Sequence, residues 1–481
     1  MTLRNLLGQV HILSSNADLD MEVGNLRIDS RCVEKGDLFF AVKGTGIDGH
    51  RFIPQAMAAG ACCVICEDCP AEGSYVQVED VRRAYSLSCC EVFGNPAKSL
   101  RMIGVTGTSG KTTTTNLIKH ILETQIGAKC GLIGTNCNVI GHRVIHTEYT
   151  TPDSYELQSL LREMVDEGCS FCIMEVSSHS IAQHRVEGIH YEVAAFTNLS
   201  QDHLDLHGTM QEYAAVKRKL FSFCDTGCIN MDDAWSDFMC DGAECPIIRT
   251  SANKKTDMYA TGIDCNFSGV HFDIWEGEST EKVSLAIPGM FSVYNALTAI
   301  SVCRAIGLSL SECSAGLASC GIVKGRMESV PTDGDYSVII DYSHKPDPLE
   351  KVLKTLRPVT RGRLIVLFGC GGDRDRLKRP IMGRIAAQNS DYVLVTSDNP
   401  RTEDPEEIIN EIMPGILECG TKYERISDRI EAIHRAIDIA ESGDVILLAG
   451  KGHEDYQVVG HEKHHMDERE IVADYLKERN G

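Results

Sequence analysis

A glycine-rich turn followed by a lysine and a run of threonines is the first feature that could do chemistry, in "RMIGVTGTSGKTTTTNLIKHILE", residues 101–123. The apolar residues before the turn predict a buried strand, and those after it recur at helical spacing. A turn that opens a helix presents backbone N–H groups to an anion. We therefore expect Gly107 to Thr112 to hold nucleotide phosphates, with Lys111 on the β and γ oxygens and Thr112 on Mg²⁺. The usual pattern has glycine where this chain has Val105, so the loop is a variant; an ordinary glycine-rich turn is the alternative.

Two further segments carry groups that could serve such a loop. In "FCIMEVSSHS" a hydrophobic strand ends in Glu175, where nucleotide-binding folds place an acid that binds magnesium; an exposed strand-end Glu is the alternative. In "FTNLSQDHLDLHG" His203 and His207 lie four residues apart, which is metal-ligand spacing if the segment is helical. Magnesium, zinc, substrate contacts and a structural turn all remain open for this segment.

Charged and amide side chains follow the ends of several strands in the last third of the chain. "DYVLVTSDNPR" delivers Asn399 and Arg401, "FGCGGDRDR" delivers Arg374 and "AGKGHEDYQ" delivers Glu454. Carboxyl ends of parallel strands share one edge, which is where open α/β sheets bind ligands. The two arginines could hold carboxylates and Glu454 could hold an amine, which suits a ligand with both groups. A solvated run of charges and a simple Asx-Pro turn are the alternatives.

The elements that must position these residues fall into three blocks. Strands and helices alternate in residues 1–98, which close at "GNPAKS", in residues 99–330, which begin with the phosphate loop, and in residues 331–481. Alternation of this kind is typical of mostly parallel, doubly wound sheets. We expect an α/β protein of three domains.

Composition limits the partners and the compartment. The 481 residues carry a formal net charge of -22, which should repel nucleic acid and anionic membranes. No apolar run is long enough for a membrane span, and the first residues lack the apolar core of a signal peptide, so we expect a cytoplasmic protein. The chain has 21 cysteines, and "CCVICEDC" reads as an apolar strand in which Cys is a small hydrophobe rather than as a zinc site.

Taken together, the motifs resemble the Mur ligases. The segments "GTSGKTTT", "MEVSSH", "FTNLSQDHLDLHG", "PGMFSVYNALTA", "GRME", "GCGGDRDRLKRPIMG", "DNPR" and "GKGHEDYQ" occur in that family's order. The resemblance implies a UDP-binding domain in residues 1–98, an ATPase domain in residues 99–330 and a Rossmann-like domain in residues 331–481. "TGTSGKT" and "DYSHKPD" depart from the commoner "TGTNGKT" and "DYAHTPD", which bears on details of nucleotide contact.

The resemblance also implies roles for individual residues. Lys217, which by itself reads as an ordinary solvated helix lysine, matches the lysine that this family carbamylates, and CO₂ on its amine would give an anion that helps to hold Mg²⁺. The remaining matches are, for ATP, Gly107, Thr108, Ser109, Gly110, Lys111, Thr112, Thr113, Asn295, Arg326 and Asp341; for magnesium, Thr112, Glu175, His203 and Lys217; for the UDP-muramoyl dipeptide, Ser30, Thr150, Thr151, Ser177, Gln183 and Arg185; and for diaminopimelate, Arg374, Asp398, Asn399, Pro400, Arg401, Gly450 and Glu454.

The implied activity is an ATP-dependent ligase that adds meso-diaminopimelate to UDP-MurNAc-L-Ala-D-Glu through an acyl phosphate. Relatives that use L-lysine tend to lack an arginine where this chain has Arg401, because a guanidinium repels lysine's distal ammonium but binds the distal carboxylate of diaminopimelate. The alternatives are the same ligase with L-lysine, a folylpolyglutamate-synthase-like enzyme, a P-loop kinase or motor, and a silent nucleotide-binding module. We expect a monomer that acts on small molecules.

Overall fold

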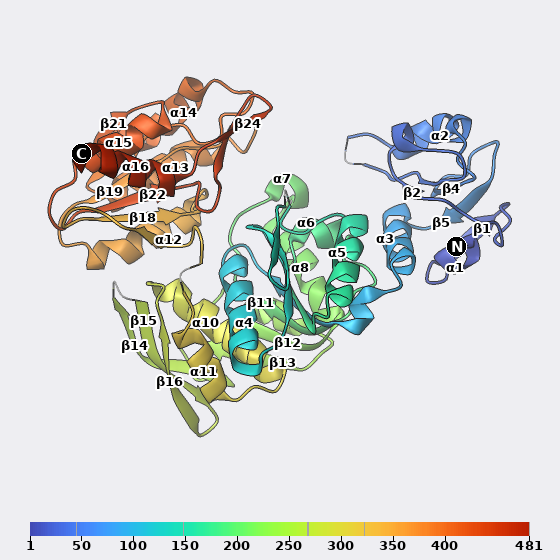
Figure 1. Ribbon diagram of the computed structural model, residues 1–481, viewed down its shortest axis with the longest axis horizontal. Coiled ribbons are helices and arrows are strands. Elements are labelled where there is room, and N and C mark those ends of the chain that lie inside the picture. The colour runs from blue at the N-terminus through green and yellow to red at the C-terminus, as the bar shows by residue number, and fades with distance from the viewer. Residues whose placement is uncertain (45, 148, 267–268, 322, 481) are drawn as a thin grey trace. The chain divides into compact units, whose positions relative to one another are not determined.

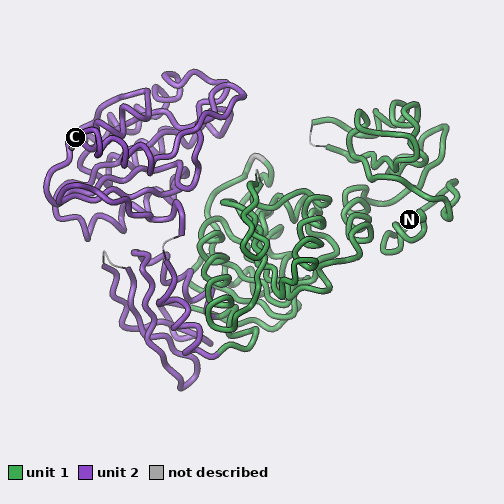
Figure 2. Tube along the Cα trace, in the orientation of Figure 1, with its two compact units in different colours: residues 1–250, 301–308 green, residues 251–300, 309–481 purple. Residues whose placement is uncertain are grey.

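The computed structural model of the chain describes residues 1–44, 46–147, 149–266, 269–321 and 323–480 (Figure 1). It forms two compact units, shown in separate colours in Figure 2. The first unit comprises residues 1–250 and 301–308, and the second comprises residues 251–300 and 309–481.

The first part of unit 1 is a small five-stranded sheet in the order β1-β5-β4-β3-β2. All neighbours are parallel except β1 and β5. Strands β3 and β4 are apolar and fully buried, as expected of parallel strands covered on both faces. Its elements are α1 (Leu3–Leu6), β1 (Ile12–Ser15), β2 (Leu26–Arg27), η1 (Ser30–Cys32), β3 (Leu38–Phe40), η2 (Gly49–Phe52), α2 (Ile53–Ala59), β4 (Cys63–Cys66), β5 (Tyr75–Val78), α3 (Val81–Val92) and η3 (Pro96–Ser99).

The second part of unit 1 carries the strands in the order β13-β12-β11-β6-β10-β7-β8-β9. The strands from β13 to β7 are parallel, and β8 and β9 add an antiparallel edge. Its elements are β6 (Arg101–Thr106), α4 (Lys111–Ile126), β7 (Cys130–Ile133), β8 (Asn138–Ile140), β9 (Arg143–Ile145), α5 (Ser154–Asp166), β10 (Phe171–Glu175), α6 (Ser178–Ala182), β11 (Tyr191–Phe196), α7 (Leu204–His207), α8 (Met210–Arg218), η4 (Lys219–Ser222), β12 (Cys224–Asn230), α9 (Ser236–Asp241) and β13 (Ile247–Ser251).

Unit 2 contains an antiparallel meander and a second parallel sheet. The parallel sheet has the order β17-β18-β22-β19-β20-β21, in which only β17 runs antiparallel to its neighbour. The elements are β14 (Met258–Asn266), β15 (Gly269–Glu276), β16 (Ser279–Leu285), α10 (Met290–Ala305), α11 (Leu310–Ala318), β17 (Glu328–Val330), β18 (Ser337–Asp341), α12 (Pro346–Leu356), η5 (Arg357–Val359), β19 (Leu364–Phe368), α13 (Lys378–Asn389), β20 (Tyr392–Val395), α14 (Pro405–Leu417), β21 (Lys422–Arg425), α15 (Arg429–Asp438), β22 (Val445–Ala449), β23 (Tyr456–Val459), β24 (Glu462–His465) and α16 (Glu468–Asn480).

The predicted α/β class with mostly parallel sheets is confirmed. The strand predicted in "CCVICEDC" is β4, whose Cys63 and Cys66 are buried among apolar side chains. Sequence patterns did not reveal the meander β14–β16 or the hairpin β23–β24. In the described residues, no helix is both long and apolar enough to span a membrane. The domain boundaries at residues 98 and 330 stay a prediction.

Helices α13 and α14 pack through glycines, and this contact fixes the loops that precede them. A Cβ atom at Gly383 would lie 2.4 Å from the Ile412 carbonyl oxygen, and one at Gly415 would lie 1.9 Å from the Pro380 carbonyl oxygen. No side chain can be accommodated at either place without moving a helix, because the atoms that it would meet are backbone.

We expect Gly415→Ala to destabilise the C-terminal sheet by about 1–3 kcal/mol, although alanine favours a helix by about 1 kcal/mol over glycine. Hydrogen–deuterium exchange of α13 and α14 measures this local change. Gly321→Ala is the control, because an added Cβ there meets no heavy atom within 4 Å. Exchange in Gly415→Ala as slow as in the wild type would contradict the close packing.

Candidate functional site

The phosphate loop joins β6 to α4, and its glycines are required by the backbone. Gly107 has φ +148°, and a Cβ there would lie 2.0 Å from Oγ1 of Thr197. Gly110 has φ +84° and immediately precedes the helix. The predicted strand, turn and helix are all confirmed, and the sharp turn directs the first N–H groups of α4 outward from the carboxyl edge of the sheet.

Two lysines lie on the carbonyl oxygens of this loop. Lys111 donates to the oxygens of Gly107 (2.9 Å) and Thr108 (3.1 Å). Lys217 also donates to the Gly107 oxygen at 2.9 Å, and its ammonium lies 4.8 Å from the centre of the Tyr213 ring. Lys217 is 1% exposed, so it is not the solvated helix lysine that its sequence context alone suggests. Its carbamylation stays a prediction.

The carboxylate of Glu175 is the centre of an oxygen-rich cluster beside the loop. It accepts hydrogen bonds from the Thr112 hydroxyl at 2.9 Å and from the Thr135 hydroxyl at 3.0 Å. The Glu175 side chain is buried, 1% exposed. Thr135 carried no motif in the sequence and was missed. Magnesium takes oxygen ligands and commonly uses one or two carboxylates with water and phosphate oxygens, so Glu175 and Thr112 suit it.

The residues assigned to the muramoyl dipeptide adjoin the same carboxyl edge. The Thr151 hydroxyl donates to the Glu175 carbonyl oxygen (2.8 Å) and accepts from the Ser177 backbone N–H (3.1 Å). Arg185 donates to the Thr151 carbonyl oxygen at 3.0 Å and to the Gln183 side chain at 2.7 Å. Burial lowers the pKa of Arg185. The Thr150 hydroxyl lies 3.0 Å from that of Thr135, which joins this group to the Glu175 cluster.

The two histidines of "DHLDLHG" do not share a helix in the way the spacing allows. His203 precedes α7 with φ +53°, and its ring lies 3.0 Å from the Asp202 carboxylate. His207 is 8% exposed, 2.9 Å from the Ser178 hydroxyl and stacked on Tyr213. Throughout the described residues, no group of three or more His, Cys, Asp and Glu side chains is placed to hold a metal. A role for His203 at magnesium stays a prediction.

Ser30 lies apart from these residues, in the N-terminal part of unit 1. It begins η1, is 7% exposed, and donates to the Gln55 side chain at 3.1 Å. Arg31 holds the pKa of the preceding Asp29 down at about 2. The contact of Ser30 with uridine stays a prediction.

Of the residues of unit 2 assigned to the nucleotide, Arg326 and Asp341 lie near each other at the end of β18. Asp341 is 6% exposed and accepts from the Met327 N–H at 2.9 Å, and burial raises its pKa. The guanidinium of Arg326 lies 5.0 Å from the Tyr342 ring centre. Asn295 is a buried residue of α10.

The loop after β20 has a backbone conformation that the residues "SDNPR" do not predict. Arg401 has φ +52°, its N–H donates to the Val458 oxygen (3.1 Å), and its own oxygen accepts from the Gly460 N–H (2.7 Å). The β23–β24 hairpin therefore holds the Arg401 backbone. The Arg401 guanidinium donates to the Gly372 oxygen at 2.8 Å, which brings it beside the loop that carries Arg374.

Asn399 and Glu454, predicted to bind one ligand, are in direct contact. The Asn399 amide donates to the Glu454 carboxylate at 2.9 Å. Asp398 is 7% exposed, and a Cβ at Gly450 would lie 2.7 Å from its Oδ2. The glycine is thus required beside Asp398, so these four assigned residues share one small region.

The other two assigned residues flank this region. Arg374 is exposed and donates to the Asp373 carbonyl oxygen at 2.9 Å. Pro400 is buried, and its carbonyl oxygen would lie 1.9 Å from a Cβ at Gly372, so the two loops are in close contact.

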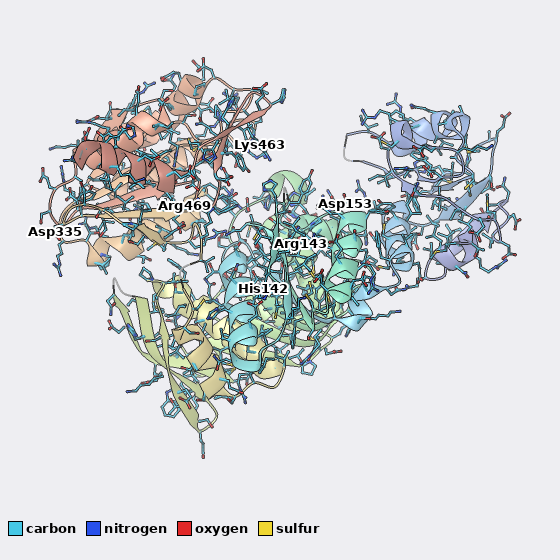
Figure 3. All side chains as sticks on the ribbon, viewed as in Figure 1. His142, Arg143, Asp153, Asp335, Lys463 and Arg469 are labelled. Atoms are coloured by element: carbon cyan, nitrogen blue, oxygen red, sulfur yellow. The ribbon has the colours of Figure 1, made fainter. Side chains whose placement is uncertain are left out.

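A buried arginine links the two strand ends that carry this region, and no sequence motif pointed to it. Arg429 donates to the carbonyl oxygens of Ser397 (3.3 Å) and Ala449 (2.9 Å) and to the Glu468 carboxylate (2.9 Å). Arg469, labelled in Figure 3, donates to the Gly452 oxygen at 3.1 Å. These arginines hold the loops after β20 and β22 by their main chains.

The chain is similar to known proteins over nearly its whole length. Family models match at residues 22–86 ("Mur ligase family, catalytic domain"), 105–303 ("Mur ligase middle domain") and 325–452 ("Mur ligase, glutamate ligase domain"). A UDP-N-acetylmuramoyl-L-alanyl-D-glutamate–2,6-diaminopimelate ligase of Clostridium acetobutylicum is 44% identical over 99% of this chain and 100% of its own, and one of Clostridium botulinum is 42% identical over 95% and 96%. A solved structure of a ligase of that name is 33% identical, with a TM-score of 0.73 over 100% of this chain and 99% of its own.

We expect the histidine next to Glu454 to make stability depend on pH. Burial, with the nearby Arg326 cation, lowers the pKa of His453 to about 3, whereas an unfolded histidine titrates near 6.5. Between these two pKa values the unfolded chain binds a proton at His453 and the native state does not. The contribution of His453 to the free energy of unfolding is therefore fully present above pH 6.5 and declines as the pH falls from 6.5 toward 3.

Denaturant unfolding of wild type and His453→Gln between pH 8 and pH 5 measures this contribution. The stability of the wild type relative to the variant should fall by about 1 kcal/mol by pH 5.5, which lies above the range where carboxylates titrate. A stability difference that is the same at pH 8 and pH 5.5 would contradict the depressed pKa.

Proposed function

The chain belongs to the Mur ligase family, and on that premise we propose that it is an ATP-dependent ligase that joins meso-diaminopimelate to UDP-MurNAc-L-Ala-D-Glu. The bond formed is an amide between an amine of diaminopimelate and the γ-carboxylate of D-glutamate. The product is a precursor of bacterial peptidoglycan.

The reaction needs two steps, because a free carboxylate is a poor acyl donor at neutral pH. The γ-carboxylate attacks the γ-phosphorus of ATP, which forms an acyl phosphate and releases ADP. The amine then attacks the acyl carbon, and phosphate leaves as the tetrahedral intermediate collapses. Positioning of the reactants supplies much of the rate in reactions of this kind.

The phosphate loop binds the triphosphate in this proposal. Backbone N–H groups from Gly107 to Thr113 face the phosphates, and Lys111 leaves the loop carbonyls for the β and γ oxygens. Glu175 and Thr112, with His203 and a carbamylated Lys217, would hold Mg²⁺, which neutralises charge on the phosphates when bound. The buried oxygen cluster around Glu175 supports this assignment.

The other substrates are assigned to separate regions. Ser30 contacts uridine in an N-terminal domain of residues 1–98, and Thr150, Thr151, Ser177, Gln183 and Arg185 hold the muramoyl dipeptide in a central domain of residues 99–330. Asn295, Arg326 and Asp341 contact the nucleotide, and residues 331–481 bind the amino acid. We expect a monomer in the cytoplasm, where its nucleotide substrates are made.

The observation that carries the choice of amino acid is the contact between Asn399 and Glu454, with Arg401 on the same loop as Asn399. A carboxylate accepts from a ligand's ammonium, and a guanidinium binds a ligand's carboxylate bidentately. The far end of meso-diaminopimelate carries both groups, whereas the far end of L-lysine carries only the ammonium. Arg374, Asp398, Pro400 and Gly450 complete the region.

The test is to incubate the purified protein with UDP-MurNAc-L-Ala-D-Glu, ATP, Mg²⁺ and either meso-diaminopimelate or L-lysine, and to measure the product mass. We expect a tripeptide product with diaminopimelate and little with L-lysine. Equal or better use of L-lysine would contradict the role of Arg401, and ATP hydrolysis that ignores both amino acids would point to another class of nucleotide-binding protein.

Arg401→Asn is the matched variant, because asparagine tolerates the left-handed backbone at this position better than most residues. Loss of the charged pair should lower kcat/KM for diaminopimelate by about 30-fold or more, with KM for ATP unchanged.

Glu175→Gln should lower kcat/KM by about 10- to 100-fold and raise the Mg²⁺ concentration needed for half-maximal rate. The amide keeps the shape but donates where the cluster needs an acceptor, so Thr112 or Thr135 loses its partner. A magnesium titration of the rate measures this. Glu192→Gln is the control, because it removes a carboxylate that pairs with Arg101 on the surface and should change neither value. An unchanged magnesium titration in Glu175→Gln would contradict the assignment of Glu175 to the magnesium site.

A further inference from the structure

Lys451 follows β22 and has its ammonium fully enclosed. Its side chain is 0% exposed. The ammonium donates to Oδ1 of Asn399 at 2.8 Å and to Oε2 of Glu454 at 2.8 Å, and it lies 5.4 Å from the centre of the Tyr456 ring. A buried ammonium is tolerated only where acceptors satisfy it, so these contacts fix where each partner can lie.

The first consequence is the orientation of the Asn399 amide. Its Oδ1 accepts from Lys451 and from the Val458 N–H (2.9 Å), which uses both acceptor positions of that oxygen. Its Nδ2 therefore faces Glu454 and donates to Oε2 at 2.9 Å. A cation beside Oδ1 makes the flipped amide unfavourable, because Nδ2 would then face an ammonium and an N–H.

The second consequence concerns Glu454. Both side-chain hydrogen bonds that Glu454 makes within the described residues use Oε2, from Asn399 and from Lys451. Oε1 is therefore the oxygen that can receive a ligand's ammonium. The carboxylate is also paired with a cation, so its attraction for a second cation is weakened.

The third consequence is the charge of the region. Lys451 adds a positive charge to those of Arg374 and Arg401, against the negative charges of Asp398 and Glu454. Among the residues assigned to diaminopimelate the two arginines and the two carboxylates cancel, and Lys451 adds one positive charge beside Glu454. A ligand end with both ammonium and carboxylate is neutral and is accepted, whereas an end with ammonium alone is repelled.

We propose that Lys451 is a positioning and specificity-determining residue of the amino-acid site: it fixes the Asn399 amide, aims Glu454 through Oε1, and disfavours ligands whose far end is a lone cation. The inference rests on the proposed function. Lys451 acts through Asn399 and Glu454 and itself touches no substrate.

The test is steady-state kinetics of the full chain carrying Lys451→Met, with meso-diaminopimelate and with L-lysine. Methionine suits an enclosed site and removes only the charge and the donors. KM for diaminopimelate should rise by about 30-fold, with KM for ATP and for the UDP-dipeptide unchanged. The ratio of kcat/KM values, diaminopimelate over L-lysine, should fall by at least about 10-fold, because Glu454 is then unpaired and attracts the ammonium of L-lysine.

Lys463→Met is the matched control. Lys463, labelled in Figure 3, lies over the same Tyr456 ring at 4.8 Å but is exposed. All kinetic values of this variant should equal those of the wild type. The double variant Lys451→Met with Glu454→Gln removes both charges of the buried pair, so it replaces the single variant in the kinetic test if the single variant does not fold. It should show the raised KM for diaminopimelate without the gain for L-lysine.

The outcomes separate the two claims. A wild type that forms no product with either amino acid overturns the proposed function and this inference with it. If the wild type is active, two results overturn the inference alone. One is that Lys451→Met lowers the use of both amino acids equally, and the other is that a folded double variant keeps the wild-type KM for diaminopimelate.

Discussion

Parallel strands all end at one edge of their sheet, and the chain must turn sharply there before it can return through a helix. That turn is where this protein places its chemistry. Gly107 and Gly110 after β6, and Gly450 after β22, have positive φ angles, and Arg401 adopts the same left-handed region without being a glycine. These four positions lie next to residues that the resemblance assigns to ligands. Such backbone persists only where surrounding contacts over-determine it, and the hairpin that binds Arg401 on both sides supplies them.

Cations at these turns are held by oxygen atoms of the protein itself. Lys111 and Lys217 share the Gly107 carbonyl, Lys451 binds Asn399 and Glu454, and Arg429 binds the carbonyls that end two strand loops. A chain with a net charge of -22 repels anionic substrates at long range, so it needs such fixed charges at short range. Removing one partner of a buried ion pair costs about 3–5 kcal/mol, which makes Arg429, paired with Glu468, and Lys451, paired with Glu454, part of the fold.

Local patterns predicted the local parts of these sites. The strand, glycine turn and helix around Lys111 follow from residues adjacent in sequence, and "SDNPR" follows directly after its strand. Lys451, Arg429 and Thr135 were missed because their importance comes from partners distant in sequence, as when Arg429 joins Ser397 to Ala449. Lys217 has an ordinary helical context, and only the packing of α8 under the loop makes it buried. The four-residue spacing of His203 and His207 does not put both on one helix, because α7 begins at Leu204 and His203 is its N-cap.

Selection of an amino acid by this region cannot rest on one arginine. The Arg401 guanidinium already donates to the Gly372 oxygen, so only part of its donor set can reach a ligand. An arginine alone would bind any carboxylate, and Glu454 alone would bind any ammonium. Discrimination requires that the two be bound together, at a fixed spacing and with a charge balance that penalises either alone. In this proposal the enclosed Lys451 provides that coupling, since the same ammonium orients the Asn399 amide, which joins the loops after β20 and β22, and offsets the Glu454 carboxylate that would otherwise attract a lone cation.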